Sequence, residues 1–96
     1  MHDEVQNQIF AEVLNRLILH LRKRNDVQNI DLMNLSGFCR NCLSKWYVSA
    51  AEKKGIKVNY EEAREIIYGM SYLEWKSKYQ TEATPKQLDQ RNKNKH

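Results

Sequence analysis

The sequence predicts an all-α protein, with a compact domain of four main helices and a short C-terminal helix or tail. Apolar residues recur at steps of three to five along most of the chain, which is the period of amphipathic helices. Three glycines and one proline in 96 residues leave few places to break a helix. No alternating β-branched run and no Asn-Gly or Asp-Gly hairpin turn indicates a strand. We therefore expect one helical domain over residues 1–85 and a basic tail over residues 86–96.

The first helix is expected over residues 4–24, where it would form the spine of the domain together with the second. Asp3 can cap its N-terminus, and the basic run from Arg22 to Arg24 suits the negative end of the helix dipole. One broad apolar stripe runs along this helix, made of Val5, Ile9, Phe10, Val13, Leu14, Leu17, Ile18 and Leu21. Such a stripe is typical of a helix that packs one side against a core.

A second long helix is expected from a start between Asn29 and Asp31 to a stop before Gly55. The pair Ser36-Gly37 interrupts its pattern, and a glycine inside a helix costs about 1 kcal/mol relative to alanine. This interruption indicates a kink, a close approach by a neighbouring helix, or a restart of the helix with Ser36 as its cap.

Two shorter helices follow, and each has a recognisable start. The third begins at Asn59, with Glu62 three positions on, and should stop at Gly69. The fourth begins at Ser71, and Glu74 completes a capping box. A short last helix is expected to begin at Thr84, with proline at its first helical position.

Aromatic residues recur along the third and fourth predicted helices at steps of four, three and four. They are Tyr68, Tyr72, Trp75 and Tyr79. These rings could stack on bases while Lys76 and Lys78 contact phosphates, but we favour docking on the core or on a second subunit. Residues 86–96 hold four basic residues and one acidic residue, so they carry three of the chain's four net positive charges. This basic tail is a weak signal for nucleic acid, and a solvated terminus is the simpler explanation.

The cysteines, Cys39 and Cys42, are three residues apart and can share one face of the second predicted helix. Burial as small core residues is the favoured interpretation. Zinc is the candidate cofactor, since His20 on the facing helix would complete a three-residue donor set with the two thiols. His2, His96 or a carboxylate would close such a site. Half of a metal motif is weak evidence, because no second Cys-x-x-Cys or His-x3-His is present.

A redox role for the pair requires a lowered thiol pKa. If the helix restarts at Ser36, Cys39 lies in its first turn, where the helix dipole stabilises a thiolate and Arg40 and Lys45 would assist. The strand–helix–strand pattern that accompanies thioredoxin-like motifs is absent from the sequence. This weakens the redox interpretation.

A distinctive pattern surrounds these cysteines and continues toward the C-terminus. Its parts are Asp26–Leu35, Gly37–Leu43, Lys45-Trp46-Tyr47, Glu62–Ile66, Tyr68-Gly69-Met70 and Glu74-Trp75-Lys76. Over about Phe10 to Ala83, the chain resembles an uncharacterised family of short bacterial proteins, domain of unknown function family 1244. The resemblance implies a small all-helical protein. It implies no activity and no catalytic residue.

No apolar run approaches the roughly 18 residues of a membrane span, and the acidic start from Met1 to Glu4 is unlike a secretory signal. We therefore expect a cytoplasmic protein without a structural disulfide. The leading hypothesis is a non-enzymatic binding or adaptor protein, suited to a protein partner or to a homodimer, with the Cys-x-x-Cys pair as a ligand site. One alternative is a metal- or thiol-dependent enzyme that uses Cys39, Cys42 and His20. Another is a nucleic-acid-binding accessory protein.

Overall fold

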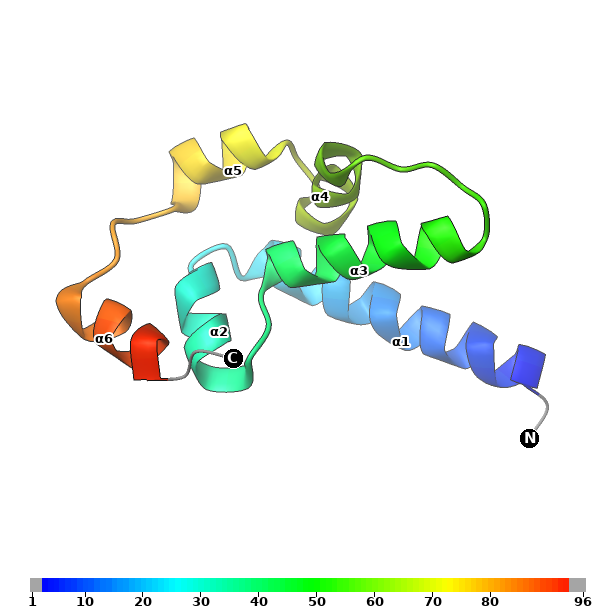
Figure 1. The fold of residues 1–96 in the computed structure, drawn as a ribbon, viewed down its shortest axis with the longest axis horizontal. Coiled ribbons are helices and arrows are strands. Elements are labelled where there is room, and N and C mark those ends of the chain that lie inside the picture. The colour runs from blue at the N-terminus through cyan, green and yellow to red at the C-terminus, as the bar shows by residue number, and fades with distance from the viewer. Residues whose placement is uncertain (1–2, 94–96) are drawn as a thin grey trace.

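Residues 3–93 are described by a computed structural model, in which they form six α-helices and no strand (Figure 1). The helices are α1 (Asp3–Lys23), α2 (Asn29–Ser36), α3 (Arg40–Lys53), α4 (Tyr60–Tyr68), α5 (Tyr72–Tyr79) and α6 (Pro85–Lys93). The predicted all-α class is confirmed, and the first helix lies within one residue of its expected bounds.

The second long helix predicted from the sequence is in fact two helices, α2 and α3. Gly37 ends α2 in the left-handed conformation, with φ 79°, which an L side chain rarely adopts. Cys39 then has an extended backbone at the N-terminus of α3, with φ −146°. Of the three alternatives for Ser36-Gly37, the restart with Ser36 as its cap is wrong, because Ser36 is the last residue of α2 and the next helix starts at Arg40. The prediction of four main helices therefore becomes five, followed by the expected short last helix.

The other helix starts follow the sequence closely. Asn59 and Ser71 each accept a hydrogen bond from the backbone N–H three residues on, at 2.8 and 3.2 Å. Thr84 and Gln87 form a reciprocal capping box at the start of α6, with bonds of 2.8 and 3.1 Å. Gly69 ends α4 in the left-handed conformation, as expected. Local capping chemistry therefore fixes these boundaries.

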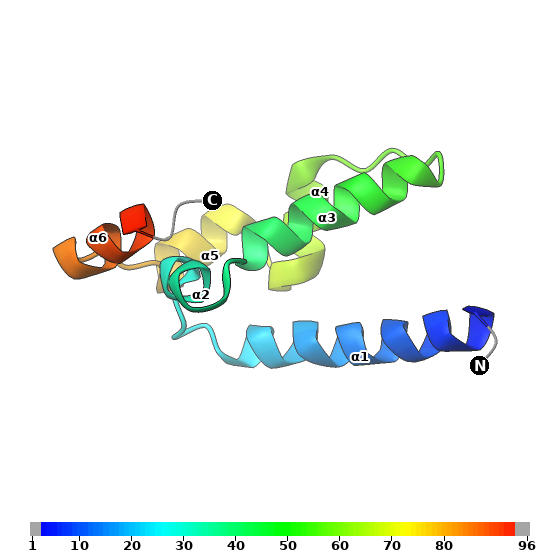
Figure 2. The ribbon, with the colours of Figure 1, turned by 60° about the horizontal axis from the view of Figure 1, so that its bottom comes forward.

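The described part of the chain is more extended than the predicted compact domain. Its extents are 47 × 28 × 25 Å, and its radius of gyration is 15.0 Å, against about 12–13 Å for a compact domain of this length. Figure 2 shows α1 below α3 and α4, with the ribbons diverging toward the N-terminus. At 1.5 Å per residue, α1 is roughly 30 Å long, and the short helices that follow do not cover its whole length.

The core lies where the C-terminal end of α1 meets α3, α4 and α5. Its buried members are Leu21, Leu43, Ile67, Tyr68 and Trp75. The rings of Tyr68 and Trp75 meet edge to face, with centroids 5.2 Å apart. These two members of the aromatic stripe thus dock on the core, which was the favoured interpretation.

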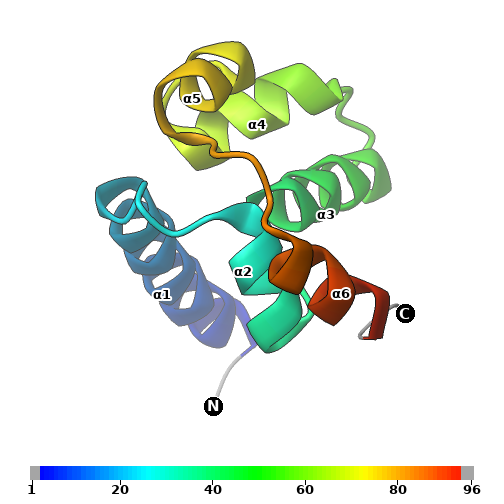
Figure 3. The same cartoon turned by 90° about the vertical axis from the view of Figure 1, so that its left-hand side faces the viewer.

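Helix α6 lies beside α2 (Figure 3). The amide of Gln87 donates to Asp31 Oδ1 at 2.8 Å, and the amide of Asn34 donates to the Gln87 carbonyl at 3.1 Å. The first part of the basic tail is therefore helical and attached to α2. Residues 94–96 lie outside the described part.

Candidate functional site

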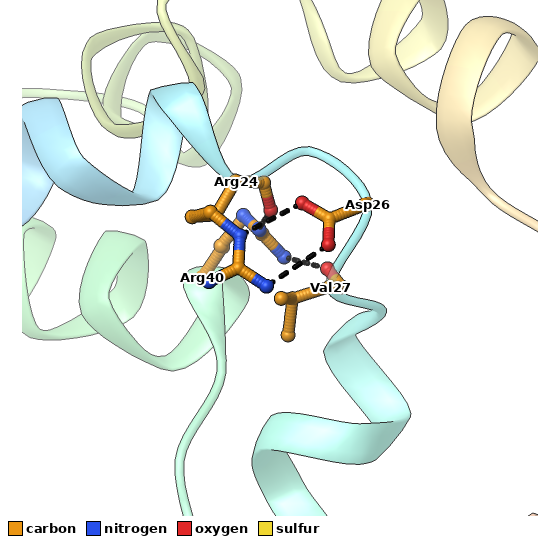
Figure 4. A network of polar contacts seen from close by, with 4 residues as sticks. All are labelled: Arg24, Asp26, Val27 and Arg40. Carbon is orange, nitrogen blue, oxygen red and sulfur yellow. Dashed lines mark hydrogen bonds and ion pairs between the residues drawn. The ribbon is translucent and has the colours of Figure 1, made fainter.

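The loop between α1 and α2 closes around the guanidinium of Arg40, the first residue of α3 (Figure 4). Arg40 is 1% exposed. Its guanidinium donates to the carbonyls of Arg24 and Val27, both at 2.8 Å, and to Asn29 Oδ1 at 3.0 Å. It also lies 5.0 Å from the centroid of the Trp75 ring. One buried cation therefore joins the loop to α3 and α5.

No carboxylate hydrogen-bonds to this guanidinium within the described residues. Asp26 pairs instead with Arg24, at 3.0 Å, on the surface of the same loop, and this bond lowers the pKa of Asp26. Burial lowers the pKa of Arg40, because desolvation disfavours its charged form. An arginine nevertheless keeps its proton at neutral pH. Its surroundings of backbone carbonyls and an aromatic face fit a structural cation better than a catalytic one.

Other long side chains hold the remaining helix ends in place. The guanidinium of Arg22 donates to the carbonyls of Ile66 and Ile67, at the C-terminal end of α4. Gln28 spans the end of α5, since its amide donates to the Tyr79 carbonyl at 2.8 Å and accepts from the Thr81 N–H at 3.0 Å. The end of α1 and the loop that follows it thus make polar contacts that hold α3, α4 and α5 in place.

The two cysteines lie at the N-terminus of α3 as free thiols. Cys39 is buried and Cys42 is half-buried, and their sulfur atoms are 3.8 Å apart. Cys42 Sγ also lies 3.8 Å from Met33 Sδ of α2. The sulfur atoms are near enough for a disulfide to form after a small movement.

Burial raises the pKa of the Cys39 thiol. A redox or nucleophilic role needs the opposite shift, because the thiolate is the reactive form. The position at a helix N-terminus that favoured the redox interpretation is therefore outweighed by desolvation at Cys39. The pair fits its favoured role as small apolar residues between α2 and α3.

The structure does not bring His20 into a donor set with the cysteines. Across residues 3–93, no three His, Cys, Asp or Glu side chains are grouped so that they could hold a metal ion. His20 is exposed on α1, while His2 and His96 lie outside the described residues. The zinc site stays a prediction, with two thiols as its local donors.

An apolar groove between α1, α3 and α4 is the largest feature that the sequence interpretation missed. Its volume is about 600 Å³. It is lined by Leu14, Asn15, Leu17, Ile18, Phe38, Leu43, Trp46, Tyr47, Ala50, Ile66 and Ile67. Trp46, on its α3 wall, is 58% exposed. The groove offers a large apolar surface with few polar groups.

The apolar stripe of α1 continues this surface beyond the groove. Among the described α1 residues, Leu21 is the one that is buried. We call eight exposed side chains the apolar face: Ile9, Phe10, Val13, Leu14, Leu17, Trp46, Tyr47 and Ile66. No clear signal of this exposed face was present in the sequence, because the predicted second helix would be long enough to cover a stripe of 17 positions, whereas α2 and α3, which replace it, are each shorter than α1. None of the helices within residues 3–93 is long and apolar enough to cross a bilayer.

A family model described as "Protein of unknown function (DUF1244)" matches residues 27–93, which is more than half of the chain. The chain belongs to the DUF1244 family. The matched range contains the Cys-x-x-Cys pair, Arg40 and all of α2 to α6, while α1 precedes it. The resemblance stated from the sequence is thereby confirmed, and the DUF1244 description supplies no activity. No curated protein matches the chain.

Proposed function

We propose that this DUF1244 protein is a non-enzymatic binding or adaptor protein that takes an amphipathic helix into its apolar groove. The groove itself is the observation that carries the proposal. It lies between helices that are held apart at one end, and its walls are almost entirely apolar. Amphipathic helices bind such grooves through apolar residues at steps of three and four.

The size of the apolar face supports a binding role. We take roughly 100 Å² for a fully exposed aliphatic side chain and roughly 200 Å² for an aromatic one. At their exposed fractions, the eight side chains then present on the order of 550 Å² of apolar area. The largest apolar patch on a typical monomer is about 300–600 Å², and patches of this size are often functional.

The alternatives have less support. The Tyr68 and Trp75 rings are buried, so they are not available to stack on bases. The raised pKa of Cys39 disfavours thiol chemistry. A binding protein also needs no catalytic group, which agrees with a groove lined by apolar side chains.

The proposal can be tested with a synthetic amphipathic peptide of about 20 residues, with leucine on one face and balanced Glu and Lys on the other. The peptide is titrated into dilute protein. Binding is followed by calorimetry and by the emission of Trp46, which should shift to the blue as its exposed ring becomes covered. Trp75 is fully buried and should contribute little to this change.

Neighbouring residues of α3 provide matched variants. Ala50 lines the groove, whereas Ser49 is equally on the surface and lines a different hollow. Ala50→Glu places a carboxylate in the groove and should weaken peptide binding by roughly tenfold or more. Ser49→Glu should change it by less than about twofold. No binding to the wild type at concentrations where it is monomeric, or equal binding by the two variants, would refute the proposed function.

A further inference from the structure

We infer that the helix occupying the groove is α1 of a second copy of this chain, paired antiparallel to the first in a two-fold symmetric dimer. This inference rests on the proposed function, because it names the partner of the same groove. It draws on the shape of α1, on its charges and on the area of the apolar face.

The chain carries both a groove and a helix segment that fits one. The α1 residues that line the groove belong to its second half, from Leu14 to Ile18. The first half carries Val5, Ile9 and Phe10, which are exposed and lie outside the groove lining. Figure 2 shows this half extending away from the other helices. An antiparallel second copy would lay its own first half over the groove, and the same contact would be repeated by symmetry.

The stripe is continuous between the two halves. Phe10, Leu14 and Leu17 are spaced by four and three residues, so they lie on one side of α1. Val5 lies nine residues before Leu14 and faces the opposite side of α1, so it is not part of this side. Phe10 would enter the neighbouring groove on the same side of α1 as Leu14 and Leu17, which line the chain's own groove. This is the self-complementary arrangement that a two-fold interface requires.

The charges of α1 favour an antiparallel pair. The helix begins with Asp3 and Glu4 and ends with Arg22 and Lys23. An antiparallel partner places each acidic end beside a basic end, and it also aligns the two helix dipoles favourably. A parallel partner would place like charges together.

One register follows from the middle of the helix. When the two copies cross at Leu14, each residue lies opposite the one that is equally far from Leu14 in the other direction along the partner helix. The same register places Phe10 opposite Ile18, which lines the groove.

The area also fits a dimer. The apolar face, at about 550 Å², forms most of the roughly 800 Å² per partner that is usual for a stable complex, and polar residues at its edge can supply the rest. A two-fold dimer covers this face on both copies at once. A foreign helix could fill the groove but would leave the first half of α1 exposed.

Sedimentation equilibrium of the full chain is the primary test. The expected particle has twice the chain mass of 11.5 kDa at tens of micromolar. Phe10→Glu should raise the dissociation constant of the dimer at least roughly 30-fold, because it places two charges in the contact. Leu19→Glu is the matched control, since Leu19 lies nine residues on and faces the opposite side of α1. Phe10 and Leu19 are 59% and 54% exposed, and Leu19→Glu should leave the mass unchanged.

A second variant keeps the test decisive if Phe10→Glu fails to fold, as judged by circular dichroism. Val13 lies three residues after Phe10 and four before Leu17, so it borders the same side of α1, and it is 62% exposed. Val13→Glu should weaken the dimer by roughly tenfold or more, because it also places two charges in the contact. A Val13→Glu dimer as tight as the wild type would overturn this interface.

The dimer and the groove can fail separately. A wild-type chain that is monomeric at tens of micromolar overturns the dimer, and binding of the synthetic peptide would then still support the proposed function. A dimer that Leu19→Glu disrupts as strongly as Phe10→Glu also overturns this interface. If the inference is correct, Phe10→Glu yields a folded monomer with an open groove that binds the peptide more tightly than the wild type does.

Discussion

Replacement of Arg40 by methionine tests the physical role of the buried cation. Methionine has a similar stem and can fill the same space, but it has no donors. The substitution would remove the guanidinium bonds to the carbonyls of Arg24 and Val27 and to Asn29 Oδ1. The Arg24 carbonyl would keep its bond from the Val27 N–H at 3.0 Å, and Asn29 Oδ1 would keep its bond from the backbone N–H of residue 40 at 3.4 Å. The Trp75 ring would also lose the charge that lies 5.0 Å from its centroid.

The expected loss follows from these acceptors. A buried polar group that loses its partner costs about 1–3 kcal/mol. The Val27 carbonyl loses its bond from Arg40 and the other two acceptors each keep one bond, so the loss in the free energy of unfolding should be about 2–3 kcal/mol, partly offset because the guanidinium no longer has to be desolvated. This is a large part of the roughly 5–15 kcal/mol that stabilises a typical domain. Arg40→Lys should fall between methionine and wild type, because an ammonium cannot reach all three acceptors at once.

Urea unfolding at fixed protein concentration, followed by circular dichroism and tryptophan emission, measures this loss. The midpoint for Arg40→Met should fall by roughly 1–3 M urea, with an unchanged slope. Arg91→Met, at an exposed position of α6, is the matched control and should change stability by less than about 0.5 kcal/mol. A loss at Arg40 no larger than that at Arg91 would refute the structural role assigned to this cation.

Three further outcomes are expected. Gly69→Ala should lower the free energy of unfolding by about 2–3 kcal/mol, roughly 1 kcal/mol more than Gly55→Ala. Both glycines have positive φ, but a Cβ at position 69 would lie 2.9 Å from the side chain of Arg22, whereas a Cβ at position 55 would meet no atom within 4 Å. Equal losses in urea unfolding would contradict this. Burial raises the pKa of Tyr68, so its contribution to stability is complete below about pH 10 and is lost as the pH rises toward the folded-state value. Tyr68→Phe should therefore show a weaker fall in unfolding free energy between pH 9 and 11 than wild type, and parallel curves would argue against it. Iodoacetamide at pH 8 should modify Cys42 before Cys39 in the folded protein, because Cys39 is buried and its pKa is raised. Trypsin cuts after Arg40, so peptide mapping can follow the two cysteines separately. Faster modification of Cys39 than of Cys42 would disprove the prediction.

The helix ends show where sequence reasoning succeeds. Asn59, Ser71 and Thr84 each bond to the backbone N–H or the side chain of a residue three positions on, and Gly69 ends α4 as expected. These interactions join residues within four positions of each other, so they depend on the local sequence alone. The interruption at Gly37 was visible for the same reason, and the structure showed that the helix stops there.

The candidate site shows where sequence reasoning falls short. The spacing of Cys39 and Cys42 correctly brought two thiols together, but the desolvation that raises the pKa of Cys39 depends on what packs around it. Nothing local marked Arg40 as buried, because its acceptors come from a loop eleven or more residues earlier. From its position in the sequence, Arg40 is instead expected to assist a thiolate at Cys39.

The sequence by itself determined the all-α class, nearly all the helix boundaries, the family and the apolar stripe of α1, because short-range hydrogen bonds and the helical period decide these features. The tertiary structure decided what that stripe faces. Helices shorter than α1 cover only its C-terminal end. The next part of the stripe therefore lines a groove, and the first half of α1 extends beyond the other helices with its apolar side chains exposed. The pattern of apolar residues indicates that a surface of α1 should be covered from water. Only the arrangement of the other helices determines how much of that surface they cover.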